Sequence, residues 1–193
     1  MIDKASFFTK IKANGLFKTL NQNQVDSFNA LFDECEKQGV TDIRQIAYIF
    51  ATVYHEVNKT MMPIEEYGKG KNRTYGHKVK YSGKPYVEPD KIYYGRGHTQ
   101  NTWYEIYEKL TKVNPNGWDF LNKPELLLQL QPSIWATVYA MRTGLYTGKK
   151  LSWYIGGSEC DFMNARRIIN GTDKAEMIMG YANKFLAALQ ATP

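Results

Sequence analysis

Hydrophobic side chains recur at helical spacing in the first part of the chain. Between residues 22 and 38 they occupy every third or fourth position: Val25, Phe28, Leu31, Phe32 and Cys35. Gly39 follows, and glycine readily adopts the left-handed backbone that ends many helices. The pattern predicts a helix over residues 22–38. A shorter helix, capped by Asp3, is expected to run to about residue 12.

The next apolar segment, which begins after Thr41, predicts the central helix of the fold. Thr41 is its expected N-cap. The apolar side chains that follow keep the helical period: Ile43, Ile46, Ala47, Phe50, Val53, Tyr54 and Val57. Ile49 and Ala51 add a second apolar stripe. Because a helix that is apolar all round is a buried helix, we expect this one in the core.

The pattern changes between Thr60 and Gly97, where glycine and proline interrupt short stretches rich in tyrosine and lysine. The interrupting residues are Gly68, Gly70, Gly76, Gly83, Pro85, Pro89, Gly95 and Gly97. Such punctuation favours hairpins and loops over helices. Residues 60–97 are therefore predicted to form a small β-rich insert.

Helical patterns return after the insert. Thr102 and Glu105 have the spacing of a capping box, which predicts a helix to about Lys112. Further helices are expected near residues 124–130, 132–143 and 160–169, the last ended by the Asn170-Gly171 pair. A second capping box, at residues 173–176, predicts a final helix to about residue 190. These elements predict one domain over residues 1–193, with a predominantly helical α+β fold and a cleft beside the insert.

Composition narrows the classes of partner. The chain of 193 residues has a formal net charge of +6, and it carries 14 Tyr, 9 Phe and 4 Trp. A basic protein favours polyanions such as nucleic acid, anionic membranes or an anionic cell wall, and aromatic faces stack on sugars and bases. Cys35 and Cys160 form neither a metal motif nor a disulfide framework, so a reducing compartment at synthesis is expected.

Three carboxylates bracket the junction between the central helix and the insert. Glu56 follows His55 at the end of the helix, beside apolar residues and near the negative end of the helix dipole. Both influences favour the protonated form of a carboxylic acid. Glu65 and Glu66 follow in extended backbone, and a neutral acid opposite an ionised carboxylate is what glycoside hydrolysis requires. The spacing alone fits better with an exposed acid at a helix end and two solvated loop acids.

Other chemistries lack their motifs. The histidines His55, His77 and His98 do not have metal-ligand spacing, and a His-Glu-x-x-His zinc motif would need histidine where Lys59 stands. The chain contains no Gly-x-Ser-x-Gly nucleophile elbow and no phosphate-binding loop of the Gly-x-x-x-x-Gly-Lys-Ser/Thr type. We expect neither a metal nor a cofactor.

Three segments of the chain carry a recognisable pattern: ATVYHE at 51–56 followed by MPIEE at 62–66, YGRGHTQNTW at 94–103, and ARRIING at 165–171. In this order they resemble the family 19 chitinase-like glycoside hydrolases and, more narrowly, their phage endolysin branch. The first resembles the start of that family's catalytic region, the second its Gly-Arg-Gly-x-x-Gln-Leu-Thr segment, and the third its Arg-x-x-Ile-Asn-Gly segment. The similarity extends over roughly residues 25–190. It implies a lysozyme-like fold in which a small hairpin or loop lobe flanks the catalytic cleft.

The resemblance assigns catalytic roles to specific residues. Glu56 corresponds to the general acid. Ile64, Glu65 and Glu66 match an apolar-x-Glu pattern that selects Glu66 as the base, with Glu65 as the fallback. Strand alternation agrees, because Glu66 shares a face with Ile64. Thr102 corresponds to the Ser or Thr that holds the attacking water.

Four further residues are expected to bind or support the substrate: Tyr67, Arg96, Gln100 and Asn170. Structural alternatives stand beside three of the assignments. Thr102 is also a good N-cap, Asn170 also suits the end of a helix, and Arg96 also suits a scaffold ion pair.

The family resemblance implies an inverting enzyme without metal or cofactor. Glu56 would protonate the glycosidic oxygen while Glu66 activates water, with the two carboxyl groups about 6.5–9.5 Å apart. The expected substrate is bacterial peptidoglycan, cut by an N-acetylmuramidase that consists of one catalytic domain without a separate cell-wall-binding domain. The alternatives are a chitinase-type β-1,4-glycanase and a non-catalytic nucleic-acid module, the latter suggested by the lysine-rich insert.

The sequence and the family resemblance also predict where the protein is made and where it acts. The N-terminus lacks the apolar region of a secretory signal, and no run approaches the ~18 apolar residues of a membrane span. We expect a monomer made in the cytoplasm of a host cell that acts on the cell wall after release by another protein. Contact with anionic membrane or lipopolysaccharide is compatible with its charge, and no nucleic-acid partner is expected.

Overall fold

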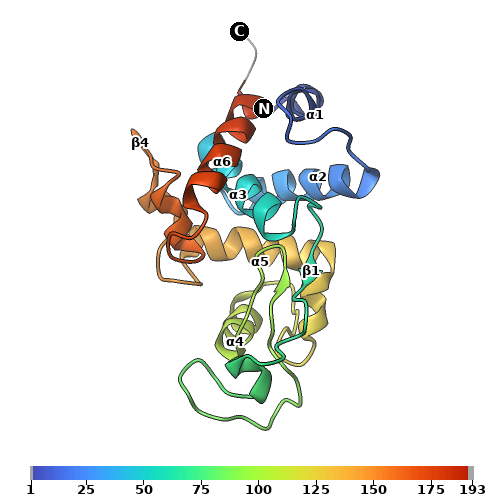
Figure 1. Ribbon diagram of the computed structural model, residues 1–193, viewed down its shortest axis with the longest axis vertical. Coiled ribbons are helices and arrows are strands. Elements are labelled where there is room, and N and C mark those ends of the chain that lie inside the picture. Colours follow the sequence, from blue (N-terminus) through green and yellow to red (C-terminus); the bar gives the residue numbers. More distant parts are fainter. Residues whose placement is uncertain (1, 191–193) are drawn as a thin grey trace. The chain divides into compact units, whose positions relative to one another are not determined.

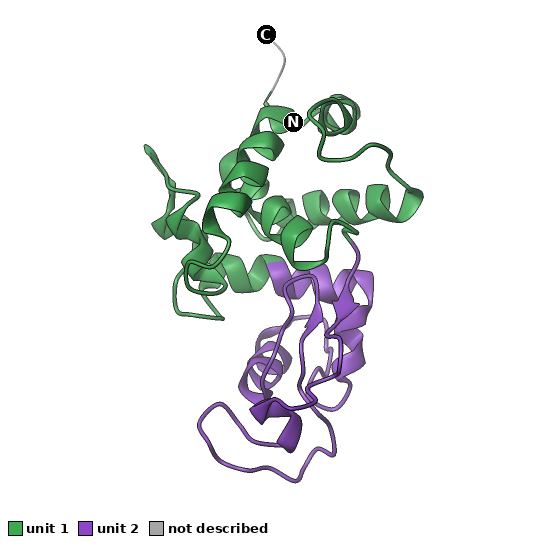
Figure 2. Cartoon of the chain, viewed as in Figure 1, with its two compact units in different colours: residues 1–61, 138–193 green, residues 62–137 purple. Residues whose placement is uncertain are grey.

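The computed structural model describes residues 2–190 (Figure 1). The chain divides into two compact units, which are coloured separately in Figure 2. Unit 1 consists of residues 1–61 and 138–193, and unit 2 of residues 62–137. In the described part of the chain, helices make up most of the regular structure and the strands are only two residues long.

Unit 1 is built around the central helix. Its α-helices are α1 (Lys4–Ala13), α2 (Gln22–Lys37), α3 (Ile43–Glu56) and α6 (Ala175–Leu189), and α5 (Leu130–Thr143) contributes residues to both units. Helix α3 packs along α6, and every residue from 46 to 54 is buried. The expectation of a core helix is confirmed.

Aromatic rings from four helices fill the core of unit 1. Phe28 of α2 lies 5.2 Å from Phe50 of α3, measured between ring centroids, and Phe185 of α6 lies 5.8 Å from Phe50. Phe7 of α1 contacts all three rings. Edge-to-face pairs at such distances are the favoured arrangement of aromatic side chains. This cluster fixes α3, and with it the position of Glu56 at the last residue of the helix.

The predicted ends of α1 and α2 are confirmed, but the predicted N-cap of α3 is wrong. The Asp3 carboxylate accepts a hydrogen bond from the Ser6 backbone N–H at 3.0 Å, and Gly39 takes φ +73° after α2. The N-cap of α3 is Asp42, not Thr41, because the Asp42 carboxylate reaches the N–H of Arg44 at 2.9 Å. The thiol of Cys35 is buried, as expected, and burial raises its pKa to about 12.

Unit 2 contains less regular structure than the sequence suggested. Strand β1 (Ile64–Glu65) pairs antiparallel with β2 (Arg96–Gly97), and the intervening chain forms a 3-10 helix, η1 (Thr74–His77), and one isolated bridge. The remaining elements are α4 (Tyr104–Val113), η2 (Pro124–Leu128) and the first part of α5. The insert is mostly loop because its glycines and prolines interrupt any longer ladder.

Both predicted capping boxes are wrong. Helix α4 begins at Tyr104, the Thr102 hydroxyl donates to the Gln100 carbonyl at 2.9 Å, and Glu105 accepts hydrogen bonds from a neighbouring loop. Helix α6 begins at Ala175, after Lys174 at φ +59°, and has no side-chain cap. In each case the residue before the helix has left-handed backbone, which moves the start of the helix away from the expected cap.

Two other predicted helices are shorter and of a different kind. Residues 160–169 contain η4 (Asn164–Ile168), which follows strand β4 (Glu159–Cys160) paired with β3 (Ile155–Gly156). Residues 124–130 contain the 3-10 helix η2. The remaining short helix, η3 (Leu151–Trp153), precedes β3. Among residues 2–190, no helix is both long and apolar enough to cross a membrane.

Candidate active site

Glu56 ends α3 in a charged contact. The Arg166 guanidinium, carried by η4, donates to the Glu56 carboxylate, with 2.5 Å between Nη1 and Oε1. The side chains are 5% and 16% exposed, respectively. Arg166 also donates through Nε to the carbonyl of Asp173 at 3.0 Å. The guanidinium is thus fixed on two sides and holds the carboxyl group in one orientation.

This environment differs from the apolar one expected. Val53 and Val57 are fully buried beside Glu56, as expected, but the sequence reasoning overlooked Arg166. A signal for it was present, because Arg166 is the arginine of the Arg-x-x-Ile-Asn-Gly match. The limited exposure of Glu56 also removes the alternative of a fully solvated acid at a helix end.

His55 and Asn170 lie in the same unit as Glu56. Burial lowers the pKa of the His55 imidazole, while the neighbouring Glu56 carboxylate acts in the opposite direction. His55 is therefore a mainly neutral side chain at pH 7. Asn170 is exposed, and its backbone N–H donates to the Arg166 carbonyl at 3.0 Å, which ends η4. In the matched segment at 165–171, Arg166 therefore contacts Glu56, whereas the Asn170 side chain lies at the surface.

In unit 2, Glu66 is held by groups distant in sequence. Its backbone N–H donates to the Gly95 carbonyl at 2.7 Å, and its carboxylate accepts from the Gly95 N–H at 3.1 Å. The Tyr75 hydroxyl lies 2.9 and 3.0 Å from the two carboxylate oxygen atoms of Glu66. Burial, followed by this hydrogen bond, raises the pKa of Tyr75 to about 12, so the phenol remains a donor. Sequence reasoning had identified neither Tyr75 nor Gly95 as a partner of Glu66.

Glu65 has different surroundings from Glu66. Its carboxylate pairs with the ammonium group of Lys69 at 2.9 Å and accepts from the Tyr94 hydroxyl at 3.0 Å. The Glu65 side chain is 36% exposed. The Lys69 hydrogen bond, supported by Tyr94, lowers the pKa of Glu65. Glu65 therefore belongs to a surface ion pair.

Gln100 and Thr102 lie next to the backbone that binds Glu66. Gln100 donates to the carbonyls of Ile64 and Gly97, both at 3.1 Å, which ties it to the paired strands. A Cβ atom on Gly95 would lie 2.8 Å from Oε1 of Gln100 and 3.4 Å from Oγ1 of Thr102. Glycine at this position therefore permits the close approach of Gln100. The structure brings Glu66, Gln100 and Thr102 into one cluster of unit 2.

Arg96 and Tyr67 occupy contrasting places in unit 2. The Arg96 guanidinium is buried, stacks 3.5 Å from the centroid of the Tyr94 ring and donates to the Tyr107 hydroxyl at 3.1 Å. It also donates to the Ile92 carbonyl at 3.0 Å. Arg96 thus braces the scaffold around β2, whereas the Tyr67 side chain is fully exposed.

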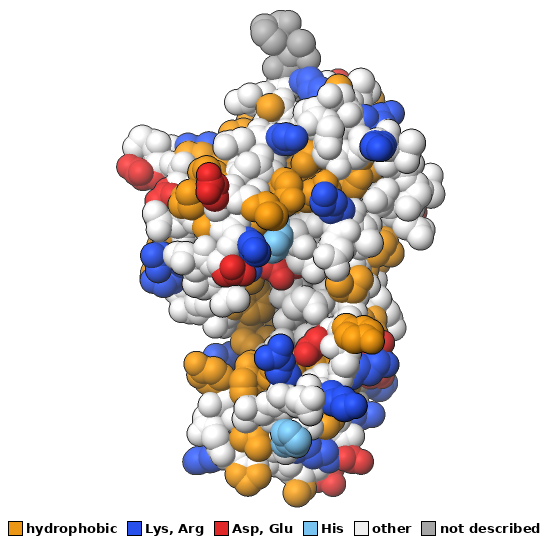
Figure 3. Space-filling view, in the orientation of Figure 1, with side chains coloured by type: hydrophobic (Ala, Val, Ile, Leu, Met, Phe, Trp, Pro, Cys, Tyr) orange, Lys and Arg blue, Asp and Glu red, His pale blue; other side chains and the backbone are white. Residues whose placement is uncertain are grey.

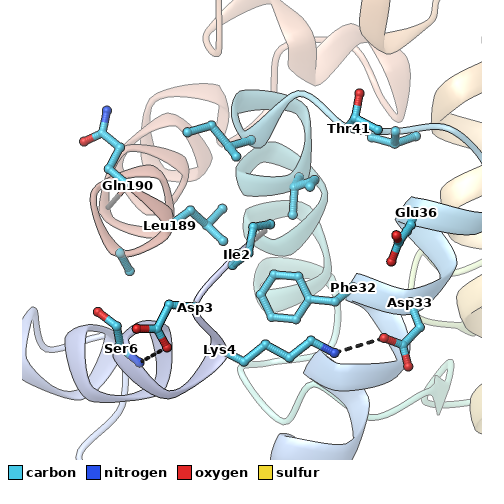
Figure 4. A pocket seen from close by; sticks show the side chains of 14 residues that line it. Ile2, Asp3, Lys4, Ser6, Phe32, Asp33, Glu36, Thr41, Leu189 and Gln190 are labelled. Atoms are coloured by element: carbon cyan, nitrogen blue, oxygen red, sulfur yellow. Dashed lines mark hydrogen bonds and ion pairs between the residues drawn. The ribbon is translucent and has the colours of Figure 1, made fainter. Parts of the chain in front are cut away.

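A pocket of about 760 Å³ lies elsewhere, in unit 1 (Figure 4). Ends of α1, α2 and α6 and the start of α3 line it, with Lys4, Phe32, Asp33 and Leu189 among the side chains drawn. Glu56 lies at the opposite end of α3, and the pocket contains none of the expected site residues. Over residues 2–190, no three His, Cys, Asp or Glu side chains are grouped to hold a metal ion.

Chitinases are among the solved structures that share this fold. Chitinase C from Streptomyces griseus HUT6037 superimposes with a TM-score of 0.68 and 21% sequence identity, over 97% of this chain and 76% of that chain. A mutant chitinase C with glutamate replaced by glutamine gives a TM-score of 0.60 and 19% identity, over 99% and 93% of the two chains. A bacterial family 19 chitinase gives a TM-score of 0.61 and 20% identity, over 100% and 96%.

No protein-family model and no curated protein sequence matches this chain. At these identities, the structural similarity establishes the fold. The predominantly helical α+β fold expected from the sequence is confirmed, and it is the fold seen in a bacterial family 19 chitinase.

Proposed function

We propose that the protein is a glycoside hydrolase that cleaves β-1,4 bonds of bacterial peptidoglycan with inversion, using Glu56 as acid and Glu66 as base. The observation that carries the proposal is the way the two carboxyl groups are held. Arg166 fixes Glu56 in unit 1, and Gly95 and Tyr75 fix Glu66 in unit 2. Preorganised carboxyl groups on a fold shared with chitinases support acid–base hydrolysis of a glycan.

The proposed reaction needs only groups of this chain and water. Glu56 donates its proton to the glycosidic oxygen, so that the bond to the anomeric carbon breaks and the leaving sugar departs as an alcohol. Glu66 accepts a proton from water, whose oxygen attacks the anomeric carbon from the opposite face. Arg166 stabilises the negative charge that Glu56 acquires when its proton leaves.

Thr102 is the proposed water-positioning residue. Its hydroxyl donates its single proton to the Gln100 carbonyl at 2.9 Å. The hydroxyl oxygen therefore retains lone pairs that can accept a hydrogen bond from the attacking water. Because Thr102 does not cap α4, the two expected roles do not compete for the hydroxyl.

Glu66 is favoured over Glu65 as the base. Glu65 is neutralised by Lys69 in an exposed pair, whereas Glu66 adjoins Gln100 and Thr102 through Gly95. We expect Glu66→Gln to reduce hydrolysis of purified peptidoglycan by roughly 10²- to 10⁴-fold, the range for loss of a general base. Glu65→Gln, the matched control, should change it little. Azide, added as a substitute nucleophile, should partly restore the activity of the Glu66→Gln protein. An inactive Glu65→Gln protein together with an active Glu66→Gln protein would instead identify Glu65 as the base.

Charge favours peptidoglycan, whose peptide stems carry carboxylates, over neutral chitin. Lys and Arg side chains are exposed at several places on the face drawn in Figure 3. The lysine-rich part of the insert contributes Lys69, Lys71, Arg73, Lys78, Lys80 and Lys84. A positively charged surface attracts an anionic polymer. This preference supports the role of a phage-type endolysin that acts on the cell wall.

The second candidate is a chitinase, favoured by the chitinases that share the fold. Mass spectrometry of products from purified peptidoglycan and from chitin separates the candidates. Fragments with a reducing-end N-acetylmuramic acid would support the muramidase, and a reducing-end N-acetylglucosamine would make the enzyme a glucosaminidase. Release of chitin oligosaccharides with no product from peptidoglycan would favour the chitinase. A protein that hydrolyses neither polymer would contradict both.

A further inference from the structure

Three aromatic rings form a row in unit 2, with Glu66 at one end. The Tyr75 hydroxyl contacts the Glu66 carboxylate, and the Tyr75 ring lies 5.3 Å from the Trp103 indole, measured between centroids. The Tyr81 ring also contacts the indole, with 5.2 Å between centroids and 85° between the ring planes. Tyr81 is 77% exposed, so the row runs from the proposed base to the solvent.

The exposed end of the row is held in place by the start of α4. The backbone N–H groups of Tyr81 and Ser82 donate to the two oxygen atoms of the Glu105 carboxylate at 3.0 and 3.1 Å. The turn is closed by two backbone bonds of 2.9 and 2.8 Å that involve Lys80. The Lys80 ammonium lies 3.9 Å from the centroid of the Tyr104 ring. An exposed tyrosine is thereby fixed at a defined position, although its own side chain adds little to the core.

The middle of the row carries backbone strain. Trp103 has φ +77° and ψ +142°, a conformation that bulky residues rarely adopt. Such a conformation persists only where the surrounding structure imposes it. Here the Trp103 N–H donates to the Tyr93 carbonyl at 2.8 Å, and the indole lies between the rings of Tyr75 and Tyr81. Strain of this kind occurs at binding sites more often than elsewhere.

We propose that the exposed ring of Tyr81, held edge-to-face against Trp103, forms a stacking platform for an N-acetylhexosamine ring of the glycan strand, outside the bond that is cleaved. The proposal rests on the proposed function. The apolar C–H face of a pyranose packs on an aromatic face, while phenol and indole groups hydrogen-bond to sugar hydroxyl groups. Tyr75 contacts both the Glu66 carboxylate and the Trp103 ring. The ligand of the platform is therefore the glycan strand that is cleaved, with the stacked sugar one or more residues away from the base.

The test compares strand lengths in the full chain carrying Glu56→Gln, so that bound glycan is not cut. Calorimetry would measure the Kd of soluble peptidoglycan strands of two, four and six sugars, with and without Tyr81→Ala. One aromatic contact corresponds to about 3- to 10-fold in affinity. We expect Tyr81→Ala to raise the Kd of the six-sugar strand by about that factor, to leave the two-sugar strand unchanged, and to be rescued by Tyr81→Phe.

The control is Trp153→Ala, which removes an exposed aromatic ring from unit 1. It should leave every Kd unchanged. Equal Kd values for the Tyr81→Ala protein and its parent at all strand lengths would overturn the platform and leave the proposed function standing. A parent protein that binds no strand of any length, while remaining folded by circular dichroism, would overturn the proposed function and the platform together.

Discussion

The ion pair between Glu56 and Arg166 allows a quantitative prediction. Replacing Arg166 by methionine retains an apolar stem and removes the guanidinium, which leaves Glu56 at 16% exposure without its charged partner. Removing one partner of a buried pair costs about 3–5 kcal/mol, and the residual exposure of Glu56 places this one near 3 kcal/mol. Loss of the bond from Arg166 to the Asp173 carbonyl adds about 1 kcal/mol. Arg166→Met should therefore lower the free energy of unfolding by about 4 kcal/mol.

Glu56→Gln is the milder change. The amide oxygen still accepts a hydrogen bond from Arg166, but the charge is lost, so we expect a cost of about 1–2 kcal/mol. At roughly 2–4 °C per kcal/mol for a chain of this size, the Tm should fall by about 2–8 °C for Glu56→Gln and by about 8–16 °C for Arg166→Met.

The assay is a double-mutant cycle followed by thermal unfolding. The two substitutions together should cost less than the sum of the single changes, by a coupling energy of about 1.5–2 kcal/mol, because the second substitution removes a contact already lost. Arg166→Lys serves as the control that keeps the charge without the planar fork. Additivity within about 0.5 kcal/mol would refute the inference that the pair orients Glu56.

Three further predictions concern pH, the aromatic row and salt. Burial lowers the pKa of His55, so the unfolded chain binds a proton at His55 more readily than the folded chain does. The Tm should therefore fall as the pH drops from about 7 to 5, and it should fall less in the His55→Gln protein. Glu105→Gln weakens the hydrogen bonds from the backbone N–H groups of Tyr81 and Ser82, so these two amides should exchange hydrogen faster. Unchanged exchange rates would contradict the inference that Glu105 holds the turn at Tyr81 in place. Neutralising three exposed cations should lower the rate of peptidoglycan hydrolysis most at low ionic strength, because salt screens exposed charges beyond about 8 Å at physiological concentration. An equal loss of rate at every salt concentration would show that these cations do not attract the substrate from a distance. These cations are Lys71, Arg73 and Lys84.

Periodicity predicted the elements whose apolar faces determine their packing. The burial of α3 follows from its apolar spacing, and the end of α2 before Gly39 follows from one left-handed glycine. The capping boxes at Thr102 and at residue 173 failed because such a motif requires β-region backbone at the cap. Trp103 and Lys174 instead have left-handed backbone, which tertiary contacts impose and local sequence does not reveal.

The partners of the proposed catalytic residues were harder to foresee. Arg166 stands 110 positions from Glu56, and the sequence gives no reason to pair them beyond the matched motif. Tyr75 lies in the short 3-10 helix η1, within a glycine-rich segment whose sequence has no periodicity, so nothing local indicates that its hydroxyl reaches Glu66. Long-range contacts made by loops depend on the whole fold, whereas the carboxylates themselves were recognisable from their motifs.

The most direct test of the central claim measures cell-wall clearing by purified wild-type protein and by Glu56→Gln at matched concentration. Circular dichroism and thermal unfolding of the variant would first establish that it remains folded despite the weakened contact with Arg166. Loss of the general acid predicts a fall in clearing rate of at least about 10²-fold, with binding to intact peptidoglycan retained. A folded Glu56→Gln protein that clears cell walls at the wild-type rate would contradict the assignment of Glu56 as the catalytic acid.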